Sequence, residues 1–186
     1  MDPNRLVKVS KYLSKYLRHE PESLGLELQP GGWVPVDQLL AACAQRRFSI
    51  TSAELEEVVA KNDKQRFSFD TDRTRIRANQ GHSTEVDLQL TPQPPPDILY
   101  HGTGAMTVEI ILCEGLNRRD RHHVHLSADW ETARRVGSRH GAPVVFNVAT
   151  LIMCEAGHVF YRSSNGVWLT DSVPPQYLSI NAPEHG

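Results

Sequence analysis

One proline-rich stretch, Thr91-Pro-Gln-Pro-Pro-Pro-Asp97, most constrains how this chain can fold. Proline fixes φ and removes a backbone donor, so the stretch is expected to be stiff and extended. The residues on its two sides follow different patterns, with helical spacing before it and short β segments after it. We therefore predict two lobes, residues 1–90 and 98–186, joined by a linker at 91–97.

The N-terminal lobe is predicted to begin with an amphipathic helix. Asp2 can cap it, with Pro3 as the first helical residue, and Pro21 stops it, so the helix runs from about Pro3 to His19. Its apolar stripe comprises Leu6, Val9, Leu13, Tyr16 and Leu17, and the opposite side carries Lys8, Lys11, Lys15 and Arg18. A basic face is often only solvated. Arg18 and His19 could instead hold a phosphate and move a proton, although His19 could also simply interact with the helix dipole.

Short strands and further helices are expected in the rest of this lobe. A strand at 24–28 and a tight turn at 29–32 precede an extended stretch at 33–36 and a helix at 36–46. Thr51-Ser-Ala-Glu54 is a capping box that starts another helix, and residues 67–69 and 75–78 form a hairpin. Helix, strand, helix, helix and hairpin is the order of a winged-helix domain, a scaffold often used on nucleic acids, although a fold alone does not give a function.

The second lobe is predicted to be α+β. Strands are expected at 98–101, 124–127, 144–148 and 167–170, with helices at 104–114, ending on Gly115, and at 129–136.

Charge and cysteine content restrict the possible partners and compartment. The net charge is −2, so any site for a polyanion must be local, and the first nineteen residues hold five Lys/Arg against one Asp. Cys43, Cys113 and Cys154 are far apart and are interpreted as buried thiols in a reducing compartment. The chain shows no signal peptide and no apolar run long enough for a membrane span, which predicts a cytoplasmic protein.

Several loops carry residues suited to chemistry. Arg66 follows the third helix and could also be a solvated helix-end arginine, and Gln80-Gly-His82-Ser83 could be a turn with satisfied polar groups. Tyr100-His101-Gly-Thr103 lies between a strand and a helix, where glycine would let a ligand approach the backbone and the helix N-terminus would attract negative charge. It is neither a Rossmann fingerprint nor a P-loop. Histidines at 122–125 suggest a metal, but no complete ligand set accompanies them, and we expect none.

Taken together, these motifs resemble the NAD-dependent RNA 2′-phosphotransferases, which remove the 2′-phosphate left at tRNA splice junctions. The resemblance covers nearly the whole chain except the linker and residues 182–186. It rests on Lys8–His19, Gly32-Trp33, Asn62-Asp-Lys-Gln-Arg-Phe67, Gln80-Gly-His-Ser83, His101-Gly-Thr103, His123-Val-His-Leu-Ser127, Ser138-Arg-His-Gly141 and Asn165-Gly-Val-Trp-Leu-Thr170.

The resemblance implies a winged-helix lobe that handles RNA and an ADP-ribosyltransferase-like lobe, with a mixed β core, that binds NAD as co-substrate. Its catalytic quartet falls on Arg18, His19, Arg66 and Arg139. The NAD-side pattern of two histidines and an apolar residue falls on His101, His125 and Val167. With the strand-end motifs, the candidate NAD site comprises His101, Gly102, Thr103, His125, Leu126, Ser127 and Val167. The candidate RNA contacts are Lys8, Lys11, Lys15, Gln80 and His82.

The predicted partners are 2′-phosphorylated RNA and NAD, with no membrane and no metal, and we expect a monomer. Two other functions use the same features: NAD-dependent ADP-ribosylation of terminal phosphates of RNA or DNA, and nucleic-acid binding without catalysis. The second gives no role to His101-Gly-Thr103 or His125-Leu-Ser127.

Overall fold

In the computed structural model, which describes residues 1–61 and 64–180, the first element is the helix α1 (Pro3–Arg18). The Asp2 carboxylate accepts a hydrogen bond from the backbone N–H of Arg5 at 3.0 Å, which confirms the predicted cap. Val9, Leu13 and Leu17 of the apolar stripe are completely buried. Asn62 and Asp63 of one family motif, and residues 182–186, lie outside the described residues.

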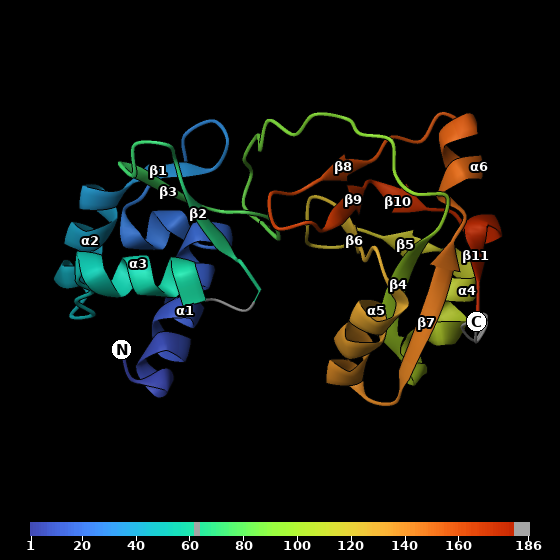
Figure 1. The fold of residues 1–186 in the computed structure, drawn as a ribbon, viewed down its shortest axis with the longest axis horizontal. Coiled ribbons are helices and arrows are strands. Elements are labelled where there is room, and N and C mark those ends of the chain that lie inside the picture. Colours follow the sequence, from blue (N-terminus) through green and yellow to red (C-terminus); the bar gives the residue numbers. More distant parts are fainter. Residues whose placement is uncertain (62–63, 181–186) are drawn as a thin grey trace. The chain divides into compact units, whose positions relative to one another are not determined.

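The chain divides into two units, Met1–Gln89 and Leu90–Gly186 (Figure 1). Each unit has its own hydrophobic core. The proline-rich stretch packs on the second unit: the Gln93 N–H donates to the Phe160 carbonyl at 2.9 Å, and the Thr150 hydroxyl donates to the Pro96 carbonyl. Much of residues 91–97 is therefore held in place by contacts with that unit.

The first unit combines three helices with a small antiparallel sheet. After α1 come η1 (Pro21–Leu24), β1 (Trp33–Pro35), α2 (Val36–Gln45), α3 (Ser52–Lys61), β2 (Phe67–Phe69) and β3 (Arg75–Ala78). The sheet order is β1-β3-β2, and Ile76 at its centre is opposite both Val34 and Phe69. The predicted capping box is present, because Thr51 and Glu54 exchange backbone-to-side-chain hydrogen bonds of 2.9 and 3.2 Å. The hairpin at 67–78 is confirmed as well.

The strand predicted at residues 24–28 is wrong. Residues 21–24 form the 3₁₀-helix η1, and Gly25 then takes a left-handed conformation with φ +70°. Leu24 and Leu26 are buried, so their alternation reflects packing into the core rather than pairing with another strand. Alternating burial alone does not distinguish these two cases.

The second unit contains short strands and short helices. They are β4 (Leu99–Gly104), η2 (Ala105–Thr107), α4 (Val108–Glu114), β5 (Leu116–Asn117), β6 (Val124–Leu126), α5 (Trp130–Gly137), η3 (Ser138–His140), β7 (Pro143–Val148), α6 (Thr150–Glu155), β8 (Tyr161–Arg162), β9 (Trp168–Thr170), β10 (Ser172–Val173), η4 (Pro175–Tyr177) and β11 (Leu178–Ser179). Three sheets result, in the orders β11-β7-β4, β6-β9-β8 and β10-β5. All strand pairs recorded among the described residues are antiparallel, so the expected mixed β core is corrected to an antiparallel one, and the class is α+β.

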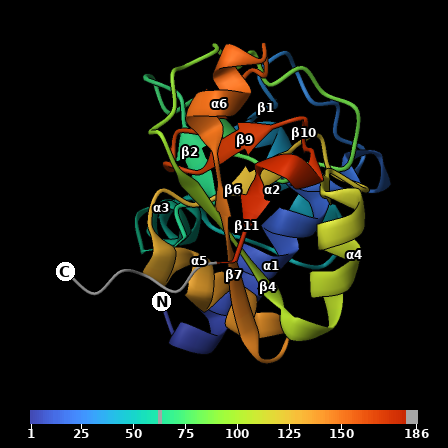
Figure 2. The same ribbon diagram turned by 90° about the vertical axis from the view of Figure 1, so that its right-hand side faces the viewer.

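The helix α5 packs so closely against β4 that side chains at the contact have little room. Figure 2 shows the helix beside the long β4–β7 pair. A Cβ on Gly102 would lie 1.6 Å from the Ala133 carbonyl oxygen. A Cβ on Gly137 would lie 2.7 Å from the Thr103 carbonyl oxygen. Glycine is therefore required at Gly102 by the helix that covers it, whether or not a ligand also approaches this backbone.

Two further expectations need correction. The helix expected over 104–114 begins as the 3₁₀ turn η2 and becomes α-helical only at Val108. Cys113 on this helix is exposed, whereas Cys43 is fully buried and burial raises the pKa of its thiol to about 11. In the described part of the chain, no helix is both long and apolar enough to cross a membrane.

Candidate functional site

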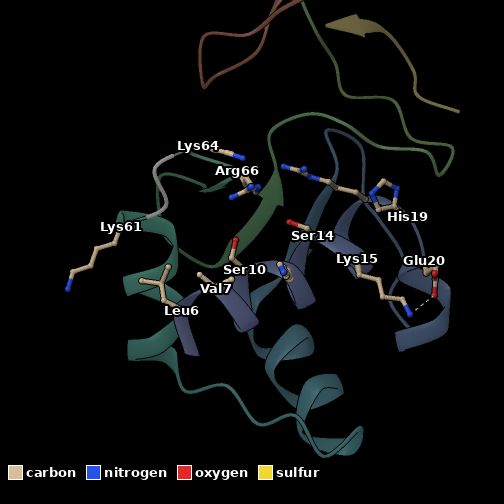
Figure 3. Close-up of a pocket in the computed structure, with 12 residues that line it drawn as sticks. Leu6, Val7, Ser10, Ser14, Lys15, His19, Glu20, Lys61, Lys64 and Arg66 are labelled. Atoms are coloured by element: carbon tan, nitrogen blue, oxygen red, sulfur yellow. Dashed lines mark ion pairs between the residues drawn. The ribbon is translucent and has the colours of Figure 1, made fainter. Parts of the chain in front are cut away.

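A basic cavity of about 630 Å³ lies in the first unit, against α1 (Figure 3). Its lining brings together three predicted catalytic residues, Arg18, His19 and Arg66. The other residues that line it are Leu6, Val7, Ser10, Lys11, Ser14, Lys15, Glu20, Lys61 and Lys64. The lining thus holds six Lys or Arg and one Glu, a charge balance suited to a polyanion.

A repeated tetrapeptide forms the α1 wall of this cavity. Residues 10–17 read Ser-Lys-Tyr-Leu twice, and a four-residue repeat keeps each residue type nearly in line on a helix of 3.6 residues per turn. Ser10 and Ser14 therefore face the cavity side by side, while Leu13 and Leu17 point into the core. Because serine is short, it leaves open space beside the lysines and Arg18.

Arg18 and His19 are positioned where α1 ends. Two guanidinium nitrogens of Arg18 are buried, and its Cζ lies 6.0 Å from the centre of the Phe67 ring. The Arg18 carbonyl, which has no partner within the helix, accepts hydrogen bonds from the backbone N–H groups of Ser83 and Thr84 at 2.9 and 3.2 Å. His19 leaves helical geometry, and its Nδ1 lies 2.8 Å from the Ser83 hydroxyl.

Arg66 reaches the cavity from the start of the hairpin. Its carbonyl accepts from the Asn79 N–H at 2.9 Å, and the Asn79 amide donates to the Gln65 carbonyl at 2.6 Å. The two ends of the β2–β3 hairpin thus fix the backbone on either side of Arg66. Figure 3 shows Arg66 and Lys64 on one rim, with Ser10 and Ser14 below them and His19 on the other side.

Two lysines of the lining have carboxylate partners. Lys15 lies 3.2 Å from Glu20, and Lys61 lies 2.7 Å from Glu57. Lys11 and Lys15, both predicted RNA contacts, line the cavity, but Lys8 does not: its ammonium lies 5.9 Å from the Phe48 ring centre. Lys8 thus stands at the edge of the basic face rather than within it.

The loop after the hairpin differs from its sequence-based interpretation. His82 is completely buried, so it cannot offer its ring to RNA in this structure. Gln80 is half-buried and is not part of the cavity lining. Ser83, by contrast, touches His19. The sequence singled out the loop with Ser83 but not its contact with His19. It did not indicate the lining residues Ser10, Ser14, Lys61 and Lys64, although the Ser-Lys-Tyr-Leu repeat is a signal for the two serines.

A second cluster, in the second unit, forms where β4 and β6 meet. The backbones of Tyr100 and Ser127 exchange hydrogen bonds of 2.9 and 2.7 Å, which brings His101 next to His125. The Nδ1 of His101 lies 3.1 Å from the His125 carbonyl oxygen. A carbonyl only accepts, so Nδ1 carries the proton and Nε2 is an acceptor when the ring is neutral. Burial lowers the pKa of His101, which favours that neutral form.

The other predicted NAD contacts differ in exposure. Gly102, Thr103 and Leu126 are buried, and the Thr103 hydroxyl is 2.6 Å from that of Thr107. Ser127 follows β6 and Val167 precedes β9, and both are partly exposed. Because Leu126 is opposite Trp168, Ser127 and Val167 lie near each other at the same end of the β6–β9 pair.

Arg139 lies on η3 and is exposed. The η3 turn packs on the end of β4, where a Cβ on Gly104 would lie 2.2 Å from the His140 carbonyl oxygen. Of the other histidines, His123 has its Nε2 3.9 Å from an oxygen of Asp171. Within residues 1–61 and 64–180, no three His, Cys, Asp or Glu side chains gather as a metal site would require.

Comparison with known proteins places these features in a family. Residues 4–172 match the family described as "RNA 2'-phosphotransferase, Tpt1 / KptA family". Among similar proteins, one from Trichormus variabilis is 64% identical over 97% of this chain and 99% of its own length, and one from Nostoc punctiforme is 61% identical over 96% and 98%. A Flavobacterium johnsoniae protein is 45% identical over 98% and 100%, and all three are called "Probable RNA 2'-phosphotransferase". The chain belongs to the RNA 2′-phosphotransferase, Tpt1/KptA family.

Proposed function

We propose that this protein transfers the internal 2′-phosphate of an RNA, as left at a tRNA splice junction, to NAD. The products are RNA with a free 2′-OH, nicotinamide and ADP-ribose 1″,2″-cyclic phosphate. Family membership supports the RNA phosphotransferase activity. The use of NAD, the identity of the catalytic residues and the names of the two folds are part of the proposal.

The basic cavity is the observation that carries this proposal. Arg18, His19 and Arg66 come from the end of α1 and from the start of the hairpin, yet they line one space. Arginine presents a fixed fork of donors that matches phosphate oxygens, and histidine can donate or accept a proton near neutral pH. A 2′-phosphate dianion fits this set of groups, with Lys11 placed for a neighbouring RNA phosphate and Lys15 able to reach one if it exchanges its Glu20 partner.

The second unit supplies the candidate NAD site. The Nε2 of His101, an acceptor while the ring is neutral, suits a ribose hydroxyl, and His125, Ser127 and Val167 lie on the adjoining strand ends. We assign Arg139 to the reacting phosphate from this unit. The first unit has the element order of a winged-helix domain, and we interpret the second as an ADP-ribosyltransferase-like lobe.

In the first step, an oxygen of the RNA 2′-phosphate attacks the anomeric carbon of the nicotinamide riboside, and nicotinamide leaves. This nucleophile is already a dianion, so the protein mainly has to position it. In the second step, the ribose 2″-OH attacks phosphorus and expels the RNA 2′-oxygen, which takes up a proton. New charge develops on the phosphoryl and leaving oxygens, where the arginines stabilise it and His19 can supply the proton.

The test is incubation of the pure protein with NAD and an oligonucleotide that carries one internal 2′-phosphate. We expect 2′-OH product and cyclic phosphate, and no reaction of the same oligonucleotide without the phosphate. A stable ADP-ribosylated oligonucleotide as the end product would replace the proposal with phosphate ADP-ribosylation, and binding without any product would leave a nucleic-acid-binding module. We further propose that the enzyme acts as a cytoplasmic monomer.

A further inference from the structure

We infer that Ser83 is a positioning residue for His19, and that it assigns proton transfer to the Nε2 atom of that ring. The inference rests on the proposed function and adds to it a residue outside the catalytic quartet. Its basis is one contact: the Ser83 hydroxyl oxygen lies 2.8 Å from Nδ1 of His19. This distance is normal for a hydrogen bond between a hydroxyl and an imidazole nitrogen.

Main-chain hydrogen bonds fix the backbone of Ser83 beside His19. The N–H groups of Ser83 and Thr84 both donate to the Arg18 carbonyl, which belongs to the peptide that links Arg18 to His19. On its other side the loop is anchored by His82, which is completely buried. Gly81 makes the required turn with φ +86°. Ser83 therefore contacts this segment twice, through its backbone at the Arg18 carbonyl and through its hydroxyl at the His19 ring.

A hydroxyl partner suits a histidine that changes its protonation state. Toward a neutral ring with its proton on Nε2, Ser83 donates to Nδ1; toward the imidazolium, it accepts from Nδ1–H. The contact therefore persists in both states, unlike a bond to a carboxylate, which would favour the cation. Glu20, the one acidic residue of the cavity lining, is paired with Lys15, and the other charged groups that line the cavity with His19 are lysines and arginines.

If the contact only stabilised the fold, loss of the hydroxyl would lower the unfolding midpoint and leave the rate of the folded protein unchanged. A positioning role predicts the reverse. Ser83 is exposed, and an exposed neutral hydrogen bond contributes little net stability. Loss of its hydroxyl should leave the unfolding midpoint nearly unchanged, while the His19 ring loses its fixed orientation. Loss of a group that orients a reacting side chain typically costs about 10- to 100-fold in rate.

The experiment compares Ser83→Ala, Ser83→Thr and the neighbouring control Thr84→Ala in single turnovers of the 2′-phosphorylated oligonucleotide with NAD. Thr84→Ala keeps both main-chain bonds to Arg18, so it and Ser83→Thr should react like the wild type. Ser83→Ala should react about 10- to 100-fold more slowly. A wild-type rate for Ser83→Ala, or an equal loss in Thr84→Ala, would overturn the inference.

A readout that needs no turnover separates this inference from the proposed function. Ring ¹⁵N NMR of His19, assigned with His19→Gln, should show a clear change in the Nδ1 chemical shift between the wild type and Ser83→Ala, because Nδ1 loses its hydroxyl partner. In Ser83→Asp, the new carboxylate should raise the pKa of His19. If the wild type fails to react, the proposed function fails while these spectra still test the contact; unchanged spectra in Ser83→Ala would refute the contact itself.

Discussion

Arg18 and Arg66 are positioned in different ways, and this bears on what each substitution should do. Arg18 is partly buried beside Phe67, while the backbone on either side of Arg66 is fixed by the hairpin. Alanine at either position removes a positive charge from the cavity, and at Arg18 it also removes the contact with Phe67. The consequence should appear in catalysis, and more in the second step than in the first.

We expect Arg18→Ala, His19→Ala and Arg66→Ala to slow the second step most, because new charge develops at phosphorus only there. Loss of one preorganised donor costs about 3–4 kcal/mol, or on the order of 10²–10³ in rate, so the branched ADP-ribosylated RNA intermediate should accumulate. Arg139→Ala should affect both steps.

The measurement is a time course with a labelled 2′-phosphorylated oligonucleotide. Arg73→Ala is the matched control, because Arg73 is an exposed arginine that does not line the cavity. Equal loss of both steps in all variants, with no intermediate, would assign these residues to substrate binding instead.

His101 should make stability depend on pH. Burial lowers its pKa in the folded protein, whereas the unfolded chain takes up a proton near pH 6.5. Its contribution is therefore fully present above about pH 6.5 and is lost as the pH falls toward the lower, folded-state pKa. Urea unfolding at pH 7.5 and 5.5 should show a smaller loss in His101→Gln than in the wild type. Burial also lowers the pKa of His123, so part of the pH dependence should remain in both proteins. An equal loss of stability in the wild type and in His101→Gln would show that His101 does not take up a proton on unfolding.

At the scale of elements, α1 is tied to α3 through the capping box. Glu54 accepts from the Arg5 side chain at 3.0 Å and from the Thr51 N–H at 2.9 Å, and these bonds, the first above all, lower the pKa of Glu54 to about 2. We expect Glu54→Ala to reduce the free energy of unfolding by about 1–2 kcal/mol, measured by urea denaturation at pH 7. Glu56→Ala, on the exposed side of the same helix, should change it by less than about 0.5 kcal/mol. Equal effects would mean that the box does not stabilise α3.

The contact of α5 with β4 makes a sharper prediction for the second unit. Gly102→Ala would place a methyl group 1.6 Å from the Ala133 carbonyl oxygen, so the helix has to move, at a cost of roughly 3 kcal/mol. Gly157→Ala is the control: φ is +92° there, but no atom lies within 4 Å of the new Cβ, so only backbone strain of about 1 kcal/mol is expected. Thermal unfolding of both variants distinguishes the clash from the strain, and a smaller loss for Gly102→Ala than for Gly157→Ala would contradict the packing described.

At the scale of the whole molecule, the two hydrophobic cores share no residue. We therefore expect fragments 1–89 and 90–186 each to unfold cooperatively, as followed by circular dichroism. Neither fragment should convert a 2′-phosphorylated oligonucleotide with NAD, because the proposed catalytic residues come from both units. Turnover by one fragment alone would show that the other unit does not contribute to the chemistry.

The sequence by itself determined the elements whose ends depend on neighbouring residues. The start of α1 follows from Asp2 and Pro3, the start of α3 from Thr51 and Glu54, and the hairpin from alternation on either side of a turn. The signal at 24–28 failed, because buried leucines alternate in η1 and the chain after it as they would in a strand. The sequence also indicated Arg18, His19 and Arg66 as a set, but through the family resemblance rather than through any local rule.

Only the tertiary structure decided which of these residues meet. The contact of Ser83 with His19, the burial of His82 and the packing of Gly102 against Ala133 all join segments that are distant along the chain. Such contacts depend on how helices and strands pack, and packing combines many weak interactions that no short motif encodes. Local hydrogen bonding and turn chemistry therefore set where the elements begin and end, and long-range packing set the cavity and the loop that positions its histidine.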